Sequence, residues 1–202
     1  MSAKVVRFLR EVPAADRWAG ALGRPGAPTR VALGTAFALP RLPPPRFAAV
    51  EVLWFAGDHA PAADARSGGA ADEGSVVVPV EEVVVRGSDA LAARWADGGE
   101  RFKMMSFGRR HPALTRAAFA ERWRAEAGRL GGDRIPDELR GTAYVQDHPL
   151  GDDAPLDAIN EVWFDRLDDL RRRAEWFAAR PVPADLMSPG ETWSAYLREV
   201  VI

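Results

Sequence analysis

The sequence predicts an α+β fold built from two related halves. The chain has 202 residues, which is long enough for two domains of about 100 residues that each bury a core. Segments with strand and helix patterns alternate along the second half, and the first half repeats several of its marks. We therefore expect one domain over residues 1–99 and a second over residues 100–202.

The second half begins with a strand followed by a helix. Residues 102–108 form a short apolar run that suits a strand. Thr115 can cap the helix, and the glycines at 131–132 can end it. The apolar face of this helix would carry Phe119, Trp123 and Leu130.

Two further strands, a helix and a last strand complete this half. Residues 141–148 and 157–164 are β-branched or aromatic runs separated by a loop rich in proline, glycine and aspartate. Residues 193–202 supply the last strand. Between the strands at 157–164 and 193–202, apolar residues at helical spacing predict a helix that Pro181 ends. These residues are Leu167, Leu170, Ala174 and Phe177. The order strand, helix, strand, strand, helix, strand is that of a ferredoxin-like βαββαβ domain.

Short segments of the first half parallel the second. Residues 4–8 parallel 103–107, residues 54–55 parallel 163–164, and residues 82–85 parallel 199–202. A lysine begins the first pair and a Trp-Phe dipeptide forms the second. The spacing between matched segments grows along the chain, as expected if the first copy had lost pieces. The fold class is thus two tandem ferredoxin-like domains, the first degenerate.

Two stretches of the first half depart from that pattern. Residues 58–75 consist mainly of Ala, Gly, Asp and Ser, so they cannot bury an apolar face, and we expect a flexible loop. Ser88 can cap a short helix that carries Leu91 and Trp95 and leads into the second domain.

Composition excludes several classes of function. Hydrophobic residues make up 47% and charged residues 28%, as in an ordinary soluble protein. The net charge of −2 provides no large positive potential that would attract nucleic acid. The chain contains no cysteine, which excludes disulfides and thiolate nucleophiles. No apolar run approaches the roughly 20 residues of a membrane span. We expect a cytoplasmic protein without a nucleic-acid or membrane partner.

Four segments of the second half resemble the EthD-like family. These are Leu114–Trp123, Tyr144–His148, Asp157–Phe164 and Leu167–Leu170. The resemblance implies a dimeric α/β barrel, in which two ferredoxin-like sheets pack together, and a tandem chain would supply both sheets itself. Relatives include small catabolic enzymes, polyketide cyclases and proteins with no assigned reaction. The family often has a histidine four residues after the helix Trp, where this chain has Ala127, so a mechanism that needs that imidazole is in doubt.

Strand alternation places Tyr144, Gln146 and His148 on one face of their strand. An imidazole titrates near neutral pH, so His148 can act as a general acid or base. The alternative is a strand-end histidine that caps the loop before Pro149. We predict Tyr144 and His148 as catalytic residues and Gln146 as a substrate contact.

The same alternation places Asp157, Ile159, Glu161 and Trp163 on one face of the next strand. Glu161, between two large apolar side chains, can shuttle a proton as the partner of His148, or it can form a structural ion pair with an arginine. Asp157 suits a cap or turn as well as a substrate contact. Lys103, on the neighbouring strand, can hold oxyanion charge or lie at the surface.

Aromatic side chains can line an apolar cavity for a planar ligand, and Trp123 and Trp163 are the residues we place there, although helix tryptophans are more often core. The chain has no His-Glu-x-x-His motif and no phosphate-binding glycine loop, so we expect neither a metal nor a cofactor. His148 is the one histidine that invites comparison with haem-binding barrels.

The predicted function is cofactor-independent acid/base catalysis on an aromatic or polyketide intermediate, as in a polyketide cyclase or dehydratase of secondary metabolism. One alternative is an accessory protein that binds the small molecule without converting it. Another is a monooxygenase that uses no cofactor. Pairing of two chains into a homodimer is left open.

Overall fold

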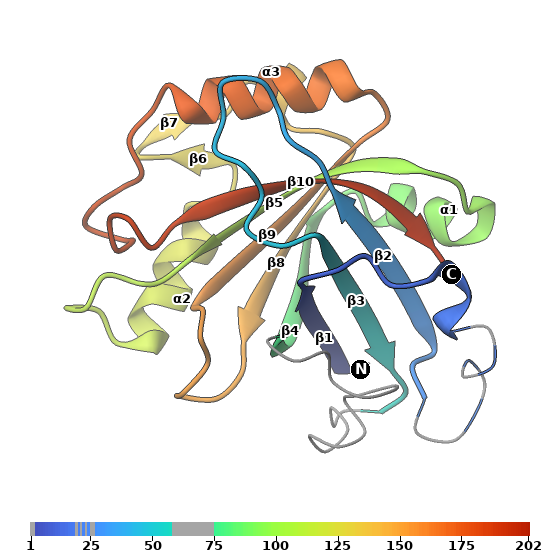
Figure 1. Cartoon of the computed structure of the whole chain (residues 1–202). Coiled ribbons are helices and arrows are strands. Elements are labelled where there is room, and N and C mark those ends of the chain that lie inside the picture. The colour runs from blue at the N-terminus through green and yellow to red at the C-terminus, as the bar shows by residue number, and fades with distance from the viewer. Residues whose placement is uncertain (1–2, 19, 21, 23, 25–26, 58–74) are drawn as a thin grey trace.

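Eight antiparallel strands close into a barrel in the computed structural model, which describes residues 3–18, 20, 22, 24, 27–57 and 75–202 (Figure 1). The strands are β1 Ala3–Leu9, β2 Arg30–Ala36, β3 Ala49–Phe55, β4 Val76–Arg86, β5 Arg101–Gly108, β8 Ala143–Pro149, β9 Ala158–Phe164 and β10 Trp193–Val201. Around the barrel their order is β1, β3, β2, β10, β5, β9, β8 and β4, which pairs again with β1. With the helices packed on this barrel, the α+β class is confirmed.

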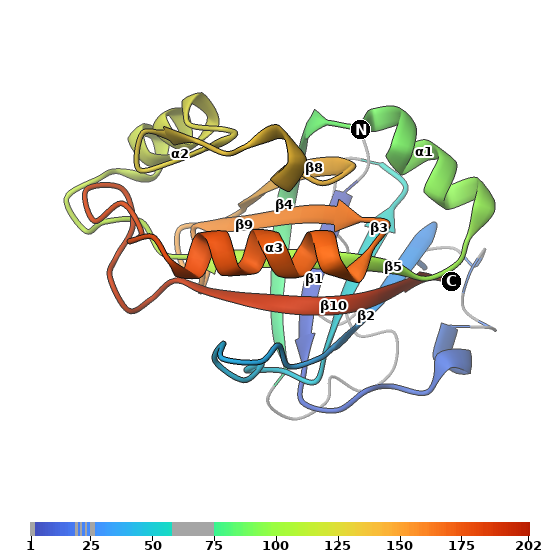
Figure 2. The ribbon, with the colours of Figure 1, turned by 90° about the horizontal axis from the view of Figure 1, so that it is seen from above.

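Three α-helices lie outside the strands: α1 Ser88–Asp97, α2 Arg116–Ala125 and α3 Leu167–Ala178. Short 3-10 helices span Ala15–Trp18 and Asp137–Leu139, and a hairpin pairs β6 Arg129–Leu130 with β7 Asp133–Arg134. The helix α3 runs across the outer face of β9, β5 and β10, and α1 lies beside the C-terminal end of β10 (Figures 1 and 2). Within the described part of the chain, no helix combines the length and apolarity needed to cross a membrane.

Each half of the chain contributes four neighbouring strands. The barrel strands of each half can be numbered one to four in chain order. Both halves then have the same spatial order, fourth, first, third and second: β4, β1, β3, β2 in the first half and β10, β5, β9, β8 in the second. The two sets join twice, through β4 with β8 and through β10 with β2. The barrel therefore closes only with strands from both halves. The division between domains near residue 99 stays a prediction, and the loop expected over 58–75 lies, except for its last residue, outside the described residues.

Two predicted helix boundaries need correction. Thr115 does cap α2, where its hydroxyl accepts a hydrogen bond from the Ala118 amide at 3.2 Å. The helix ends at Ala125, however, because Gly128 takes a φ of 82° and the following residues turn into the β6–β7 hairpin that holds Leu130. At α1, Gly87 occupies the N-cap position that the sequence suggested for Ser88.

The barrel interior is divided between apolar and charged side chains. Aromatic rings fill one end, where Phe107 stacks on Trp193 at 4.0 Å and meets Phe8 edge to face at 5.0 Å. Aliphatic side chains such as Val6 and Val52 continue this core toward the middle. The opposite end holds buried lysines and carboxylates, which cost free energy to bury unless they are paired.

Candidate functional site

Strand alternation sends neighbouring side chains of β8 and β9 into two different regions. The predicted set Tyr144, Gln146 and His148 shares one face, as expected, and this is the outer face beneath α2 and α3. Glu161 and Trp163 also share a face, but it is the inner one. His148 and Glu161 therefore lie on opposite sides of the sheet. The expected partnership between them is wrong, because alternation alone does not say which face of each strand meets which layer.

Inside the barrel, Glu161 bridges two lysines. Its carboxylate contacts the Lys4 ammonium at 2.5 Å through one oxygen and the Lys103 ammonium at 2.6 Å through the other. Lys4 also contacts Glu82 at 2.5 Å and Asp147 at 2.9 Å. These groups are almost fully buried apart from Glu82, so Glu161 fulfils the structural ion-pair alternative, with lysines in place of an arginine.

The cluster has an internal repeat that matches the sequence repeat. Two trios of equivalent side chains face each other: Lys4, Trp54 and Glu82 from the first half, and Lys103, Trp163 and Glu199 from the second. The ammonium lies 5.1 Å from the indole ring in the first trio and 5.0 Å in the second. The indole nitrogen donates to the glutamate at 3.2 Å and 2.8 Å respectively. The faint parallels between the halves therefore coincide with equivalent interior contacts.

A proton on Asp147 would balance the charges of this cluster. Arg94 on α1 also belongs to the cluster, because it pairs with Glu199. The cluster then holds three cations and four carboxylates: Lys4, Lys103 and Arg94 with Glu82, Asp147, Glu161 and Glu199. Burial raises the pKa of Asp147 well above its usual value, and the neighbouring Glu161 carboxylate raises it further. For Lys4, burial alone would lower the pKa, but the surrounding carboxylates outweigh it and raise the pKa. With Asp147 neutral, positive and negative charges are equal in number.

Three carboxylates of the cluster, from Glu82, Asp147 and Glu161, bring oxygens within 4.8 Å of one another. That arrangement of hard oxygen ligands is one that a divalent cation can use. The Lys4 ammonium contacts all three, so it supplies the positive charge at this place.

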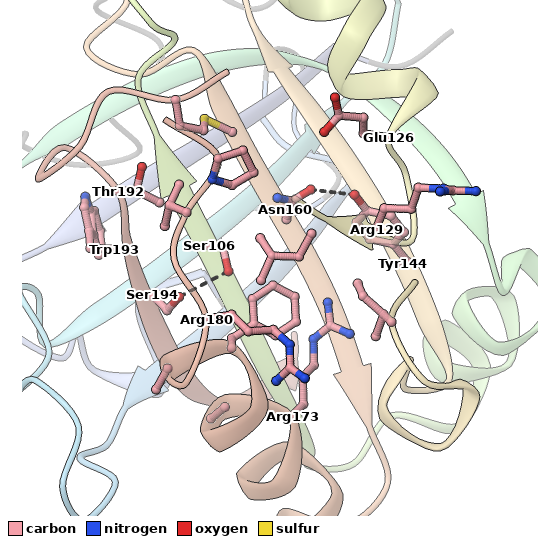
Figure 3. Close-up of a pocket in the computed structure, with 18 of the residues that line it drawn as sticks. Ser106, Glu126, Arg129, Tyr144, Asn160, Arg173, Arg180, Thr192, Trp193 and Ser194 are labelled. Atoms are coloured by element: carbon pink, nitrogen blue, oxygen red, sulfur yellow. Dashed lines mark hydrogen bonds between the residues drawn. The ribbon is translucent and has the colours of Figure 1, made fainter. Parts of the chain in front are cut away.

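On the outer side of the same sheet, a cavity of about 500 Å³ lies between the strands and the helices α2 and α3 (Figure 3). Its floor is made by outward-facing residues of the four second-half strands, among them Ser106, Asn160 and Tyr196. Apolar side chains such as Phe177 on α3 and Leu186 form its walls. The size and the mixed apolar and polar lining are typical of a small-molecule site.

A chain of hydrogen bonds crosses the floor of this outer pocket. The Tyr144 hydroxyl donates to Asn160 Oδ1 at 2.8 Å (Figure 3). The same hydroxyl accepts a hydrogen bond from Gln146 Nε2 at 2.9 Å. Gln146 also donates to the Trp123 carbonyl at 3.1 Å, which ties the chain to α2. Burial raises the pKa of Tyr144 to about 12. The phenol therefore stays neutral at pH 7, with its one O–H donated to Asn160.

Positive charge dominates the pocket lining. Six arginines and one carboxylate residue, Glu126, are found among the described residues that line it. The arginines are Arg46, Arg86, Arg129, Arg140, Arg173 and Arg180. Arg173 is the most deeply buried of the group with 7% exposure, and burial lowers its pKa to about 10. A guanidinium with this pKa is still charged at neutral pH.

Two other predicted site residues, His148 and Asp157, lie away from this pocket. Burial, and then the charge of Arg124, lower the pKa of His148 to about 4, so the imidazole is neutral at pH 7 where it packs 4.6 Å from the Trp123 ring. Asp157 forms ion pairs with Arg110 at 2.6 Å and with Arg116 at 3.1 Å, where the sequence suggested a cap or turn residue or a substrate contact.

Among the predicted catalytic residues, Tyr144 lines the pocket, whereas His148, Glu161 and Lys103 do not. Lys103 is not at the surface either, because it is held inside the barrel by Glu161 and Glu199. Among the predicted substrate contacts, Trp123 lines the pocket, and Gln146 lies behind Tyr144. Trp163 faces the barrel interior.

Sequence reasoning missed Arg173 and Asn160. Arg173 follows Leu170 by three residues and precedes Phe177 by four, so it lies on the apolar face of α3, which is an unusual place for a charged side chain. That position was a signal of a buried site. Asn160 carried a weaker signal, since alternation shows only that it lies on the face of the strand that does not hold Glu161.

A scan against protein-family models finds no match to the chain, and a search of curated proteins finds no match either. The resemblance of the second half to the EthD-like family therefore rests on the residues that carry it.

Proposed function

We propose that the protein binds a small, planar and largely apolar molecule in the outer pocket between the sheet and α3. The observation that carries this proposal is a cavity of about 500 Å³ whose apolar walls surround a few fixed polar groups. The barrel interior is filled by paired charges and aromatic rings, so it offers less room for a ligand.

A fluorescent probe and a variant that fills the pocket test this proposal. N-phenyl-1-naphthylamine is neutral, planar and emits strongly when it leaves water, and we expect it to bind the wild-type protein. The Ser194 hydroxyl lies 3.2 Å from that of Ser106 on the pocket floor, so Ser194→Trp should fill the cavity and abolish binding. Arg171→Trp, on the exposed side of α3, is the control and should bind as the wild type does. Equal binding by both variants would refute the outer pocket as the site.

Catalysis on the bound molecule is the second candidate, and the Tyr144 hydrogen-bond chain favours it. A neutral phenol beside a charged arginine can give its proton to the alkoxide that forms when an enol carbon attacks a ketone in aldol cyclisation, and the phenolate can then take the proton of the enol hydroxyl. Tyr144 would turn its one O–H from Asn160 to the substrate oxygen, Gln146 would keep donating to the phenol oxygen, and Arg173 would hold the negative charge.

Turnover separates the catalytic function from an accessory binding role. Incubation with poly-β-ketone intermediates should yield cyclised or dehydrated product, and Tyr144→Phe should lower kcat by about a hundredfold with little change in KM. Unchanged recovery of the intermediate would favour the binding protein. Oxygen uptake coupled to loss of the substrate would favour instead a monooxygenase without a cofactor.

We also infer that the chain is a tandem EthD-like protein whose two halves are ferredoxin-like units. Two observations support this inference: the strand order is the same in both halves, and the lysine, tryptophan and glutamate trio recurs inside the barrel. A truncation to residues 100–202 would test it. The isolated second half should expose the strand edges of β8 and β10 and pair with another copy, whereas a stable monomer would contradict an intramolecular barrel.

A further inference from the structure

Arg173 is a buried cation that meets no carboxylate. Its side chain is 7% exposed, and its Nη1 donates to the Leu139 carbonyl at 2.8 Å. Its Nε is buried without a hydrogen-bond partner, and within the described part of the chain no acidic oxygen comes within 4.0 Å of the guanidinium. A buried charge is expensive unless an opposite charge compensates it.

A second guanidinium makes this end of the pocket more positive. Arg86, from the end of β4, donates to the carbonyls of Arg140 and Gly141 and lines the same cavity. Its charge disfavours the charged form of Arg173, so the two cations are close enough to repel each other. The Tyr144 hydroxyl, also in the pocket wall, is neutral and adds no negative charge beside them.

The neighbouring surfaces are apolar and aromatic. The Arg173 guanidinium lies 4.5 Å from the Phe177 ring centroid, and Ala174 and Val182 also line the cavity. Figure 3 shows Arg173 and Arg180 reaching into the pocket from the side of α3. A guanidinium binds a carboxylate or sulfonate through paired hydrogen bonds. The buried Nε of Arg173 donates to no protein group, so the guanidinium keeps unused hydrogen-bonding capacity at the pocket wall.

We propose that the ligand of the outer pocket is an organic anion, an apolar or aromatic body that carries one carboxylate-like group, and that Arg173 with Arg86 binds that group. This inference rests on the proposed binding function and specifies its ligand class. The anion would supply the negative charge that the pocket lacks, and the apolar walls would bind the rest of the molecule.

A matched pair of probes tests the charge preference. The dye 1-anilinonaphthalene-8-sulfonate has the ring skeleton of N-phenyl-1-naphthylamine with a sulfonate added. The quantity measured is the dissociation constant of the neutral dye divided by that of the anionic dye. We expect Arg173→Met to lower this ratio by at least about tenfold, through weaker binding of the anion, while the affinity for the neutral dye changes less than about twofold. Arg171→Met, on the exposed side of the same helix, should leave the ratio unchanged.

A conservative variant guards against a purely structural effect. Arg173→Lys keeps the charge, so it should retain most of the preference for the anion. If Arg173→Met weakens both dyes equally, or leaves the ratio as it was, the anion site is refuted while the binding pocket stands. If the wild-type protein binds neither dye, the proposed binding function fails as well.

Discussion

Lys103 inside the barrel and Arg173 in the outer pocket are both buried cations with different partners. The Lys103 ammonium contacts Glu161 at 2.6 Å and also pairs with Glu199, whereas Arg173 has a backbone carbonyl as its acceptor. The charges of the interior cluster can be balanced within the protein once Asp147 holds a proton. In the pocket, Arg140 and Arg180 pair with Asp137 and Asp133, but Arg173 meets no carboxylate among the described residues. We therefore infer that the interior cluster contributes to stability, and the unpaired Arg173 supports the proposal of a charged ligand in the pocket.

The largest expected effect comes from breaking the interior cluster. Glu161→Gln leaves two buried lysines without their shared carboxylate, so it should lower the free energy of unfolding by about 3 to 5 kcal/mol. Asp147→Asn is the matched control, because the amide keeps the shape of a protonated Asp147 and can donate a hydrogen bond. It should change stability by less than about 1 kcal/mol. Urea denaturation measures both, and equal losses would show that Asp147 is charged in the folded protein.

His148 should give a smaller effect that depends on pH. In the folded protein the pKa of His148 is lowered to about 4. Between about pH 6.5 and pH 4, His148 is therefore protonated in the unfolded chain and neutral in the folded protein. Stability should therefore fall as the pH drops through this range, by roughly 2 kcal/mol from His148. In His148→Phe, which keeps an aromatic ring against Trp123, this part of the loss should disappear.

His111→Phe is the control for this pH dependence, since His111 lies in the loop between β5 and α2, where its Nδ1 accepts a hydrogen bond from the Ala113 amide. Urea denaturation at pH 7 and pH 4.5 compares the three proteins. The same acid-induced loss in His148→Phe as in the wild type would mean that the imidazole takes up a proton in the folded state.

The smallest expected effect is that of Arg173→Met on the protein without ligand. The substitution removes an uncompensated buried charge and one hydrogen bond to the Leu139 carbonyl, two changes of opposite sign. Stability should stay within about 1 kcal/mol of the wild type, in contrast to Lys103→Met, which should cost about 3 kcal/mol or more. A large loss from Arg173→Met in thermal unfolding would place Arg173 with the structural charges of the barrel.

Local pattern predicted much of the second half. The run at 102–108, the Thr115 cap and the apolar spacing from Leu167 to Phe177 each gave the observed element. The strand β2 was missed because its apolar run is interrupted by Gly34, where an added Cβ would lie 2.8 Å from the Leu197 side chain. The glycine is explained by a strand from the other half, which local sequence does not reveal.

The site was harder to predict for the same reason. Both faces of β8 and β9 are buried, one by the barrel interior and one by helices, so alternation sorted the side chains into two sets without saying what each set meets. For that reason His148 and Glu161 were predicted to share one site. Pairing of β4 with β8 and of β10 with β2 determines which set faces inward, and these contacts join residues far apart in the chain.

A crystal structure of the protein with 1-anilinonaphthalene-8-sulfonate would test most directly whether the outer pocket is the functional site. The rings should lie between α3 and the outer face of the sheet, with the sulfonate within hydrogen-bonding distance of Arg173. A dye bound inside the barrel against Lys4 and Glu161, or bound only outside the pocket, would contradict the assignment of the interior to stability and of the pocket to ligand binding.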